Sequence, residues 1–299
     1  MIVGAGATLP YPLYSKWATE YARVDPTVRV NYQSIGSGAG VRQAEAGVVD
    51  FGATDEELSD EVLRRGTTRL VQIPTAVGAV VLVFNLPDER ELEVSGELAA
   101  EIFLGNVKRW DDERLRAANP GRKLPNDAIT VAHRADGSGT SAALTGYLSR
   151  QNEKWRTSVG AGTSVRFPVG IGARGNEGVT AFVRATPLSF GYVEHVYAKQ
   201  AGLTVAHITS RDEEARYPIA VVSWVVLPAL PRDRFRAEAV AKFMWWAIHD
   251  GQTFASELEY TKLPAPLVTR AEQSLRELSV DGRPLLSTAQ AVPAVQAAP

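Results

Sequence analysis

The chain has 299 residues, of which 45% are hydrophobic and 22% charged, and its formal net charge is −2 at pH 7. This composition is typical of a soluble globular protein, and the length favours two domains over one. The small net charge and the lack of a long basic block argue against a nucleic-acid surface. The absence of cysteine excludes disulfides and thiolate metal sites. The most apolar runs, 77–86 and 219–230, are too short to span a bilayer.

The chain begins with a glycine loop at 4–10, and a helix pattern follows over 11–23. Apolar residues at i, i+4 and i+8 give this helix one buried face. Pro10 is placed as a first-turn proline, with Thr8 as the cap. No room is left for a strand before the loop, so we expect a leader to have been removed ahead of Met1.

The same construction recurs in the next segment. A strand at 28–32 leads into the glycine and serine loop 35–40, and a helix is predicted at 41–46. Glycine lets a backbone approach a ligand closely. A helix N-terminus has unpaired N–H groups and a partial positive charge, so it suits an oxyanion. Several such termini directed at one point would form an anion site without a metal.

Strands and helices alternate through the rest of the chain. We predict strands at 49–53, 71–74, 77–85, 129–132 and 190–193, and helices at 59–64, 98–104, 141–148, 178–184 and 236–249. This alternation is typical of an α/β fold. The tryptophans of the last helix, with Met244, are expected in the core. No repeat or low-complexity linker separates the domains.

The segment 133–140 contains the most polar chemistry in the fewest residues. Arg134 can make two parallel hydrogen bonds to a tetrahedral anion, and Asp136 can hold the guanidinium in place. Ser138 and Thr140 add hydroxyls just before the helix at 141–148. Taken alone, the segment fits an anion site and a plain helix-capping turn nearly equally well.

Familiar catalytic and nucleotide-binding motifs are absent. Leu9 occupies the place of the third glycine in a dinucleotide fingerprint, and no glycine loop has the ending of a P-loop. Asp136 stands where a nucleophile elbow requires glycine before Ser138. The four histidines are scattered singly, so we expect them to be packing or surface residues, and we expect no metal site.

Several separated motifs together resemble the phosphate-binding proteins of bacterial phosphate ABC importers, which are periplasmic substrate-binding proteins. The similarity runs from Gly4 to about Leu286. The matching segments are 4–8, 36–37, 49–55, 104–105, 110–112, 134–140, 175–179 and 191–194. Their number and order make the resemblance far more specific than any single glycine loop.

The resemblance implies a two-lobed α/β fold of the periplasmic-binding-protein type II. Lobe I would contain 1–83 and 221–299, lobe II would contain 84–220, and the strands 77–85 and 217–226 would be the hinge crossings. It also implies high-affinity binding of inorganic phosphate in the interlobe cleft and delivery to the membrane permease of an ABC importer. The implied protein is a monomer located in the periplasm or outside the cytoplasm, with no enzymatic activity and no cofactor.

The resemblance also assigns the ligand-binding residues. Lobe I would contribute Thr8, Leu9, Ser37 and Asp55. Lobe II would contribute Arg134, Asp136, Ser138, Gly139 and Thr140. The backbone N–H groups of Leu9, Ser37, Gly139 and Thr140 would be donors. The hydroxyls of Thr8, Ser37, Ser138 and Thr140 would add further donors.

Asp55 favours phosphate over sulfate within this scheme. A buried carboxylate repels an anion unless the ligand brings a proton, and phosphate retains one near neutral pH because its second pKa is about 6 to 7. Sulfate has no proton, so the buried carboxylate would face a fully ionised ligand. This should weaken sulfate binding by roughly two to five kcal/mol. The alternative is that Asp55 only caps a turn. Two departures from the family pattern are Leu9, where phenylalanine is usual, and Gly38, where a second serine is common.

Two other functions stay open at this point. The first is a binding protein for another oxyanion, such as sulfate or arsenate, or a relative that kept the fold for adhesion or signalling. The second is a phosphate-ester hydrolase, which would require a nucleophile paired with a base, or a metal site. The sequence shows neither arrangement.

Overall fold

The computed structural model describes residues 1–286, apart from 65, 67, 210–218, 230 and 232. The chain divides into two compact units, unit 1 with residues 1–77 and 222 onward, and unit 2 with residues 78–221. It passes between them twice, within the strands β4 (Leu70–Asn85) and β11 (Ala220–Pro228). The predicted lobe boundaries, 83/84 and 220/221, stay a prediction, because a lobe is defined by its independent motion.

Unit 1 contains a sheet with the strand order β2-β1-β3-β11. The bounds of its first three strands in chain order are Ile2–Gly6, Val30–Ser34 and Phe51–Thr54. Strand β1 is parallel to β2 and β3, with Gly6 opposite both Ser34 and Ala53, and β11 is antiparallel to β3. The carboxyl ends of three adjacent parallel strands therefore meet at one edge.

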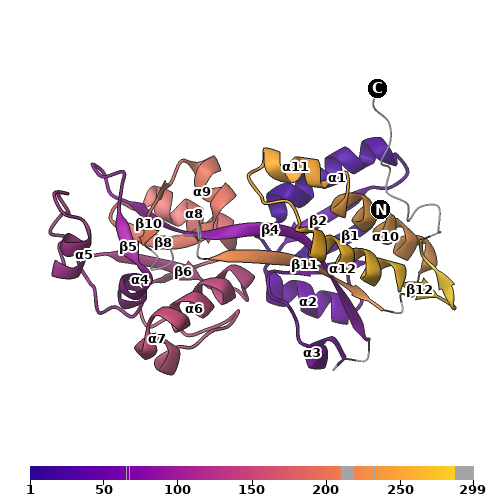
Figure 1. Cartoon of the computed structure of the whole chain (residues 1–299), viewed down its shortest axis with the longest axis horizontal. Coiled ribbons are helices and arrows are strands. Elements are labelled where there is room, and N and C mark those ends of the chain that lie inside the picture. Colours follow the sequence, from indigo (N-terminus) through magenta and orange to yellow (C-terminus); the bar gives the residue numbers. More distant parts are fainter. Residues whose placement is uncertain (65, 67, 210–218, 230, 232, 287–299) are drawn as a thin grey trace. The chain divides into compact units, whose positions relative to one another are not determined.

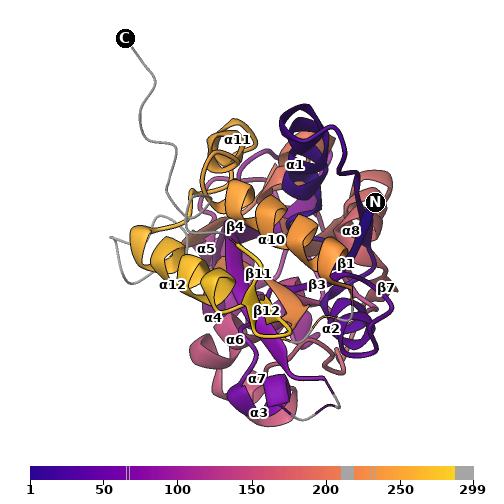
Figure 2. The same cartoon turned by 90° about the vertical axis from the view of Figure 1, so that its right-hand side faces the viewer.

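Helices cover both faces of this sheet. Helices α1 (Tyr11–Val24) and α10 (Arg234–Ile248) pack on one face, and α2 (Ser37–Glu45) packs on the other (Figure 2). Rings from α1, the sheet and α10 form an aromatic core under the first face, which includes the buried side chains of Trp17 and Phe51. Both tryptophans of α10 are buried, and the prediction that they belong to the core is confirmed.

Glycines bring α2 into direct backbone contact with the strand ends. A Cβ added at Gly40 would lie 2.4 Å from the Cα of Gly6 and 2.6 Å from the carbonyl oxygen of Ala5. A Cβ at Gly52 would meet the carbonyl oxygen of Gly40 at 2.6 Å. These glycines therefore serve close helix–strand packing, whereas the glycine pattern had predicted close approach of the backbone to a ligand.

Unit 2 repeats this arrangement with a sheet of order β4-β8-β6-β7, to which β9 (Thr204–Val205) adds beside β4. The bounds of β6, β7 and β8 are Thr130–Arg134, Ile171–Ala173 and Ser189–Glu194. These three strands are parallel, and β4 is antiparallel to β8. Each of the three leads into a helix, and these helices are α6 (Gly139–Gln151), α8 (Gly175–Ala185) and α9 (His195–Ala201).

The helices of unit 2 also lie on both faces of its sheet. Figure 1 shows α8 and α9 on one face, and α6 with α4 (Gly96–Phe103) and α7 (Glu153–Ser158) on the other. The remaining described elements are α3 (Asp60–Arg64), β5 (Glu93–Ser95), α5 (Glu113–Ala118), β10 (His207–Thr209), α11 (Gln252–Glu257), α12 (Ala265–Arg276), β12 (Ser279–Val280) and β13 (Arg283–Pro284). None of the helices that the structure describes is both long and apolar enough to cross a membrane.

Several local predictions were wrong. Residues 2–6 form the strand β1, although a loop with no preceding strand was expected there. The helix predicted at 41–46 begins four residues earlier, at Ser37, because the glycines at its start pack on the sheet instead of forming a loop. The two strands predicted at 71–74 and 77–85 are one continuous strand, β4. Residues 217 and 218 of the predicted second crossing lie outside the described residues.

Candidate anion-binding half-sites

The four predicted site residues of unit 1 lie directly after the carboxyl ends of its three parallel strands. Thr8 and Leu9 follow β1, Ser37 follows β2, and Asp55 follows β3. The backbone ties these turns together, because the N–H groups of residues 35 and 36 both donate to the carbonyl of Gly6, at 3.0 and 2.8 Å. The carboxyl edge of a parallel sheet is the usual place for a ligand in such folds.

Ser37 is the first residue of α2. Gly36 precedes it with a φ of 93°, a left-handed conformation that glycine adopts without strain. The chain can therefore turn sharply from β2 into the helix and present the N–H groups of the first helical turn at the strand edge. Such a terminus attracts an anion through its donors and its dipole.

Asp55 is buried and held by hydroxyl groups. Its Oδ1 accepts a hydrogen bond of 2.6 Å from the hydroxyl of Ser223, and its backbone N–H donates to the Oγ of Ser37 at 3.3 Å. The Thr75 hydroxyl donates to the carbonyl of Ser223 at 3.0 Å and is also bonded to the Tyr14 hydroxyl. Burial raises the pKa of Tyr14 above its ordinary value, and the negative charge of Asp55 adds to this effect.

Thr8 and Leu9 form the turn between β1 and α1, and both side chains are buried. The carbonyl of Leu9 accepts a 2.7 Å hydrogen bond from the Tyr260 hydroxyl, so the turn is anchored from the C-terminal part of unit 1. Helix α1 begins at Tyr11, one residue after Pro10, and no side chain caps it. The prediction that Thr8 caps this helix was therefore wrong, because the helix begins too late for its side chain to do so.

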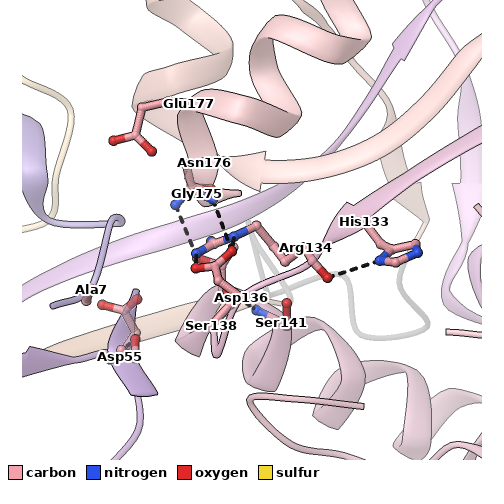
Figure 3. A network of polar contacts seen from close by, with 12 residues as sticks. Ala7, Asp55, His133, Arg134, Asp136, Ser138, Ser141, Gly175, Asn176 and Glu177 are labelled. Carbon is pink, nitrogen blue, oxygen red and sulfur yellow. Dashed lines mark hydrogen bonds and ion pairs between the residues drawn. The ribbon is translucent and has the colours of Figure 1, made fainter. Parts of the chain in front are cut away.

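The site residues of unit 2 begin at the carboxyl end of β6, where Arg134 is the last strand residue (Figure 3). Its side chain is 1% exposed and is paired with Asp136, through a 2.7 Å bond from Nε to Oδ1 and a second bond from Nη2 to Oδ2. This bidentate pair fixes the guanidinium in one orientation. His133 points its ring to the opposite side and bonds the carbonyl of Arg134 at 3.0 Å, as a packing residue does.

Asp136 also receives the first N–H of α8. The backbone N–H of Gly175 donates to its Oδ1 at 3.0 Å. Burial acts to raise the pKa of Asp136, but the hydrogen bonds and charge of Arg134, together with the N–H of Gly175, outweigh it and hold the pKa below its ordinary value. Asp136 is therefore ionised at neutral pH and joins the ends of β6 and β7.

Two hydroxyls of unit 2 accept hydrogen bonds within the unit. Ser138 caps α6 by accepting a 3.0 Å bond from the N–H of Ser141. The Oγ1 of Thr140 faces Nη1 of Arg134 at 3.5 Å and Nδ2 of Asn176 at 3.3 Å. The Asn176 amide is oriented because its Oδ1 accepts from the N–H of Glu194 at 2.9 Å. A hydroxyl that accepts in this way has its own hydrogen to donate, which suits an anion.

Gly139 is the first residue of α6, a helix of 13 residues. Its N-terminus and that of α8 both open at the carboxyl edge of the sheet, beside the Arg134 and Asp136 pair. The guanidinium has five N–H groups. Among the residues that the structure describes, its partners are Asp136 and Thr140 only, so two N–H groups have no protein acceptor. The half-site of unit 2 is thus rich in donors.

The donor set does not fit a metal ion. No group of three metal-ligating side chains occurs among the described residues. Helix N-termini and guanidinium N–H groups would repel a cation. The chemistry of both half-sites therefore favours an anion, and the carboxylate of Asp55 favours an anion that carries a proton.

Sequence reasoning missed the residues that hold the predicted ones in place. Ser223 holds Asp55, Gly175 holds Asp136, Asn176 orients Thr140, and the Tyr192 hydroxyl accepts from the backbone N–H of Arg134 at 3.1 Å. Gly175 and Asn176 lie in a segment that matched the family pattern, which was a usable signal. Ser223 lies inside an apolar strand, and nothing in its local sequence pointed to Asp55, which is 168 residues away.

Comparisons with known proteins agree with this chemistry. The family model of the PBP superfamily domain matches residues 1–250. The chain is 40% identical to the phosphate-binding protein PstS of Haemophilus influenzae, over 90% of both chains. It is 37% identical to the PstS protein of Pasteurella multocida, over 95% of this chain and 93% of that protein.

The fold is likewise found among solved structures. The phosphate-binding protein of Stenotrophomonas maltophilia superposes with a TM-score of 0.70 at 18% identity, over 90% of this chain and 92% of that protein. At that level of identity the likeness concerns the fold, which is the periplasmic-binding-protein fold predicted from the sequence.

Proposed function

Because this chain belongs to the PstS family of phosphate-binding proteins, within the PBP superfamily, we propose that it binds inorganic phosphate and delivers it to an ABC-type importer. The observation that carries the proposal is the combination of many donors with one buried acceptor, Asp55. Phosphate near neutral pH has oxygens for the donors and a proton for the carboxylate.

Each unit supports this proposal by itself. Unit 1 offers the N-terminus of α2 and the carboxylate of Asp55, and unit 2 offers Arg134 with the N-terminus of α6. One phosphate ion would take hydrogen bonds from both units, so that binding draws the lobes together. We propose the nine residues predicted from the sequence as its ligands, with the roles given there.

Delivery requires a partner and a compartment. We propose that the phosphate-loaded form docks on the membrane permease of a phosphate importer, as a monomer, outside the cytoplasm. The family relationship supports this proposal, since the relatives are named phosphate-binding proteins. No observation favours a hydrolase, and a chromogenic phosphate ester tested with and without divalent metal should show no turnover.

The decisive experiment is calorimetric titration of ligand-stripped protein with phosphate, arsenate and sulfate at neutral pH. We expect one-to-one phosphate binding, competition by arsenate, which is also protonated, and no binding of sulfate. In Asp55→Asn the repulsion of sulfate is removed, so the ratio of phosphate to sulfate affinity should fall by roughly tenfold or more. If the wild-type protein does not bind phosphate in this titration, the proposed function is wrong.

A further inference from the structure

Ser223 is buried in β11, and its hydroxyl is hydrogen-bonded to the carboxylate of Asp55. Its side chain is fully buried, and its hydroxyl lies 2.6 Å from Oδ1 of Asp55. It is the second residue of unit 1 after the chain returns from unit 2 at 221/222. A hydroxyl at this position in an apolar strand requires a partner, because an unbonded buried hydroxyl is destabilising.

The directions of the hydrogen bonds around Ser223 are determined. Its carbonyl accepts from the Thr75 hydroxyl, so Thr75 is a donor there and must accept from the Tyr14 hydroxyl. Tyr14 keeps its proton, since burial raises its pKa. Thr75 lies on β4, two residues before that strand leaves unit 1 at 77/78. Both strands that cross between the units are thus hydrogen-bonded to each other beside Asp55.

We propose that Ser223 is a positioning residue for oxyanion selectivity, because its hydroxyl holds the Asp55 carboxylate ionised and in a fixed orientation. The inference rests on the proposed function. A donor to a carboxylate favours its ionised form, and an ionised carboxylate can only accept. Ser223 therefore makes Asp55 a dedicated acceptor for the proton of the ligand. It sets selectivity for a protonated oxyanion without contacting that oxyanion.

A purely structural role for Ser223 predicts a different result. In that case its loss would lower stability and weaken the binding of every anion by a similar factor. If Ser223 acts through Asp55, its loss instead changes the ratio of the affinities for protonated and unprotonated anions. It also changes the pH at which anion binding is lost. These two readouts separate the hypotheses.

The test is calorimetry on the full chain, with inorganic phosphate and sulfate, from pH 5 to pH 9. The variants are Ser223→Ala, Ser223→Thr, which keeps the hydroxyl, and Thr75→Val as the matched control. Thr75→Val removes a buried hydroxyl from the same hydrogen-bonded group but leaves the donor to Asp55 in place. Thermal unfolding of each variant verifies that it is folded.

For Ser223→Ala we expect phosphate binding about tenfold weaker than in the wild type, as for the loss of one charge-assisted hydrogen bond. The low-pH loss of binding should move to higher pH, since the ionised carboxylate has lost a donor. The phosphate-to-sulfate ratio should fall in Ser223→Ala and stay near the wild-type value in Ser223→Thr and Thr75→Val.

Two failures are distinguishable in this experiment. If the wild type binds phosphate and Ser223→Ala keeps its selectivity ratio and its pH profile, the inference about Ser223 is wrong and the proposed function stands. If the wild type does not bind phosphate at any pH, the proposed function itself fails and takes the inference with it.

Discussion

At the scale of single residues, the pair of Arg134 and Asp136 is the strongest electrostatic feature of unit 2. Both side chains are largely buried, so removing one partner leaves the other charge uncompensated. Asp136→Asn should therefore lower the free energy of unfolding by about 3 kcal/mol at pH 7. Urea unfolding measures this change. Adding phosphate should recover part of the loss, because the anion replaces the missing negative charge.

The same pair predicts a dependence of stability on pH. The pKa of Asp136 is lower in the folded protein than its ordinary value, so its contribution is complete above about pH 4 and is lost as the pH falls through the folded pKa. The wild type should lose stability below pH 4 more steeply than Asp136→Asn. Asp111→Asn breaks an exposed pair with Arg109 and should change stability by less than about 1 kcal/mol. Equal slopes in wild type and Asp136→Asn would contradict this account.

The residues with distinctive chemistry could be predicted from the sequence, and the residues that position them could not. Arg134 and Asp136 are only two positions apart, so their pairing could be predicted from local sequence, and the two side chains are hydrogen-bonded in the structure. Ser223 and Tyr192 reach their partners only through sheet pairing and helix packing, across 168 and 58 positions. A single sequence gives no register for such contacts. The assignment of the nine ligand residues stays a prediction.

At the scale of elements, the packing of α2 on the sheet makes a sharp prediction. The Cβ of Gly40→Ala would lie within 2.7 Å of three backbone atoms, so α2 would have to move away from β1. We expect a loss of about 1 to 3 kcal/mol and weaker phosphate binding, since Ser37 at the start of α2 would move too. Gly146→Ala in α6 is the matched control, because its nearest neighbour is a side-chain nitrogen at 3.8 Å.

The control should behave in the opposite direction. Alanine is favoured over glycine inside a helix by roughly 1 kcal/mol, so Gly146→Ala should be neutral or stabilising in the same unfolding experiment. A Gly40→Ala variant as stable as the wild type would show that α2 tolerates the displacement, and the close-packing argument would be wrong.

Helices and strands could be predicted where a single hydrophobic periodicity continued without interruption. The helix of residues 11–23 and the alternation of strands and helices match the structure closely, and the α/β fold is confirmed. Strand β1 was missed because glycine and alanine fill it, and such residues carry no β signal. Strand β4 was divided in the prediction because Pro74 disfavours a strand interior.

At the scale of the whole molecule, the question is whether one anion is shared by both units. A shared phosphate should slow amide hydrogen exchange in both at once, at the start of α2 in unit 1 and at the starts of α6 and α8 in unit 2. Arg134→Met keeps most of the volume of the buried side chain but removes the positive charge and the N–H donors of the guanidinium. If one ion takes hydrogen bonds from both units, this variant should lose phosphate-induced protection in unit 1 as well.

Ligand binding and protection from exchange are thermodynamically linked. A ligand stabilises a segment only through its differential affinity for the protected and open states, and at 100 times its Kd it contributes about 2.7 kcal/mol. Exchange without phosphate serves as the control, because Arg134 belongs to unit 2 and unit 1 should then exchange at the wild-type rate in Arg134→Met. Separate anions in the two units would give the opposite pattern, in which unit 1 keeps its protection and only unit 2 loses it. That pattern would leave phosphate binding in place but would contradict the part of the proposed function in which both units share one ligand.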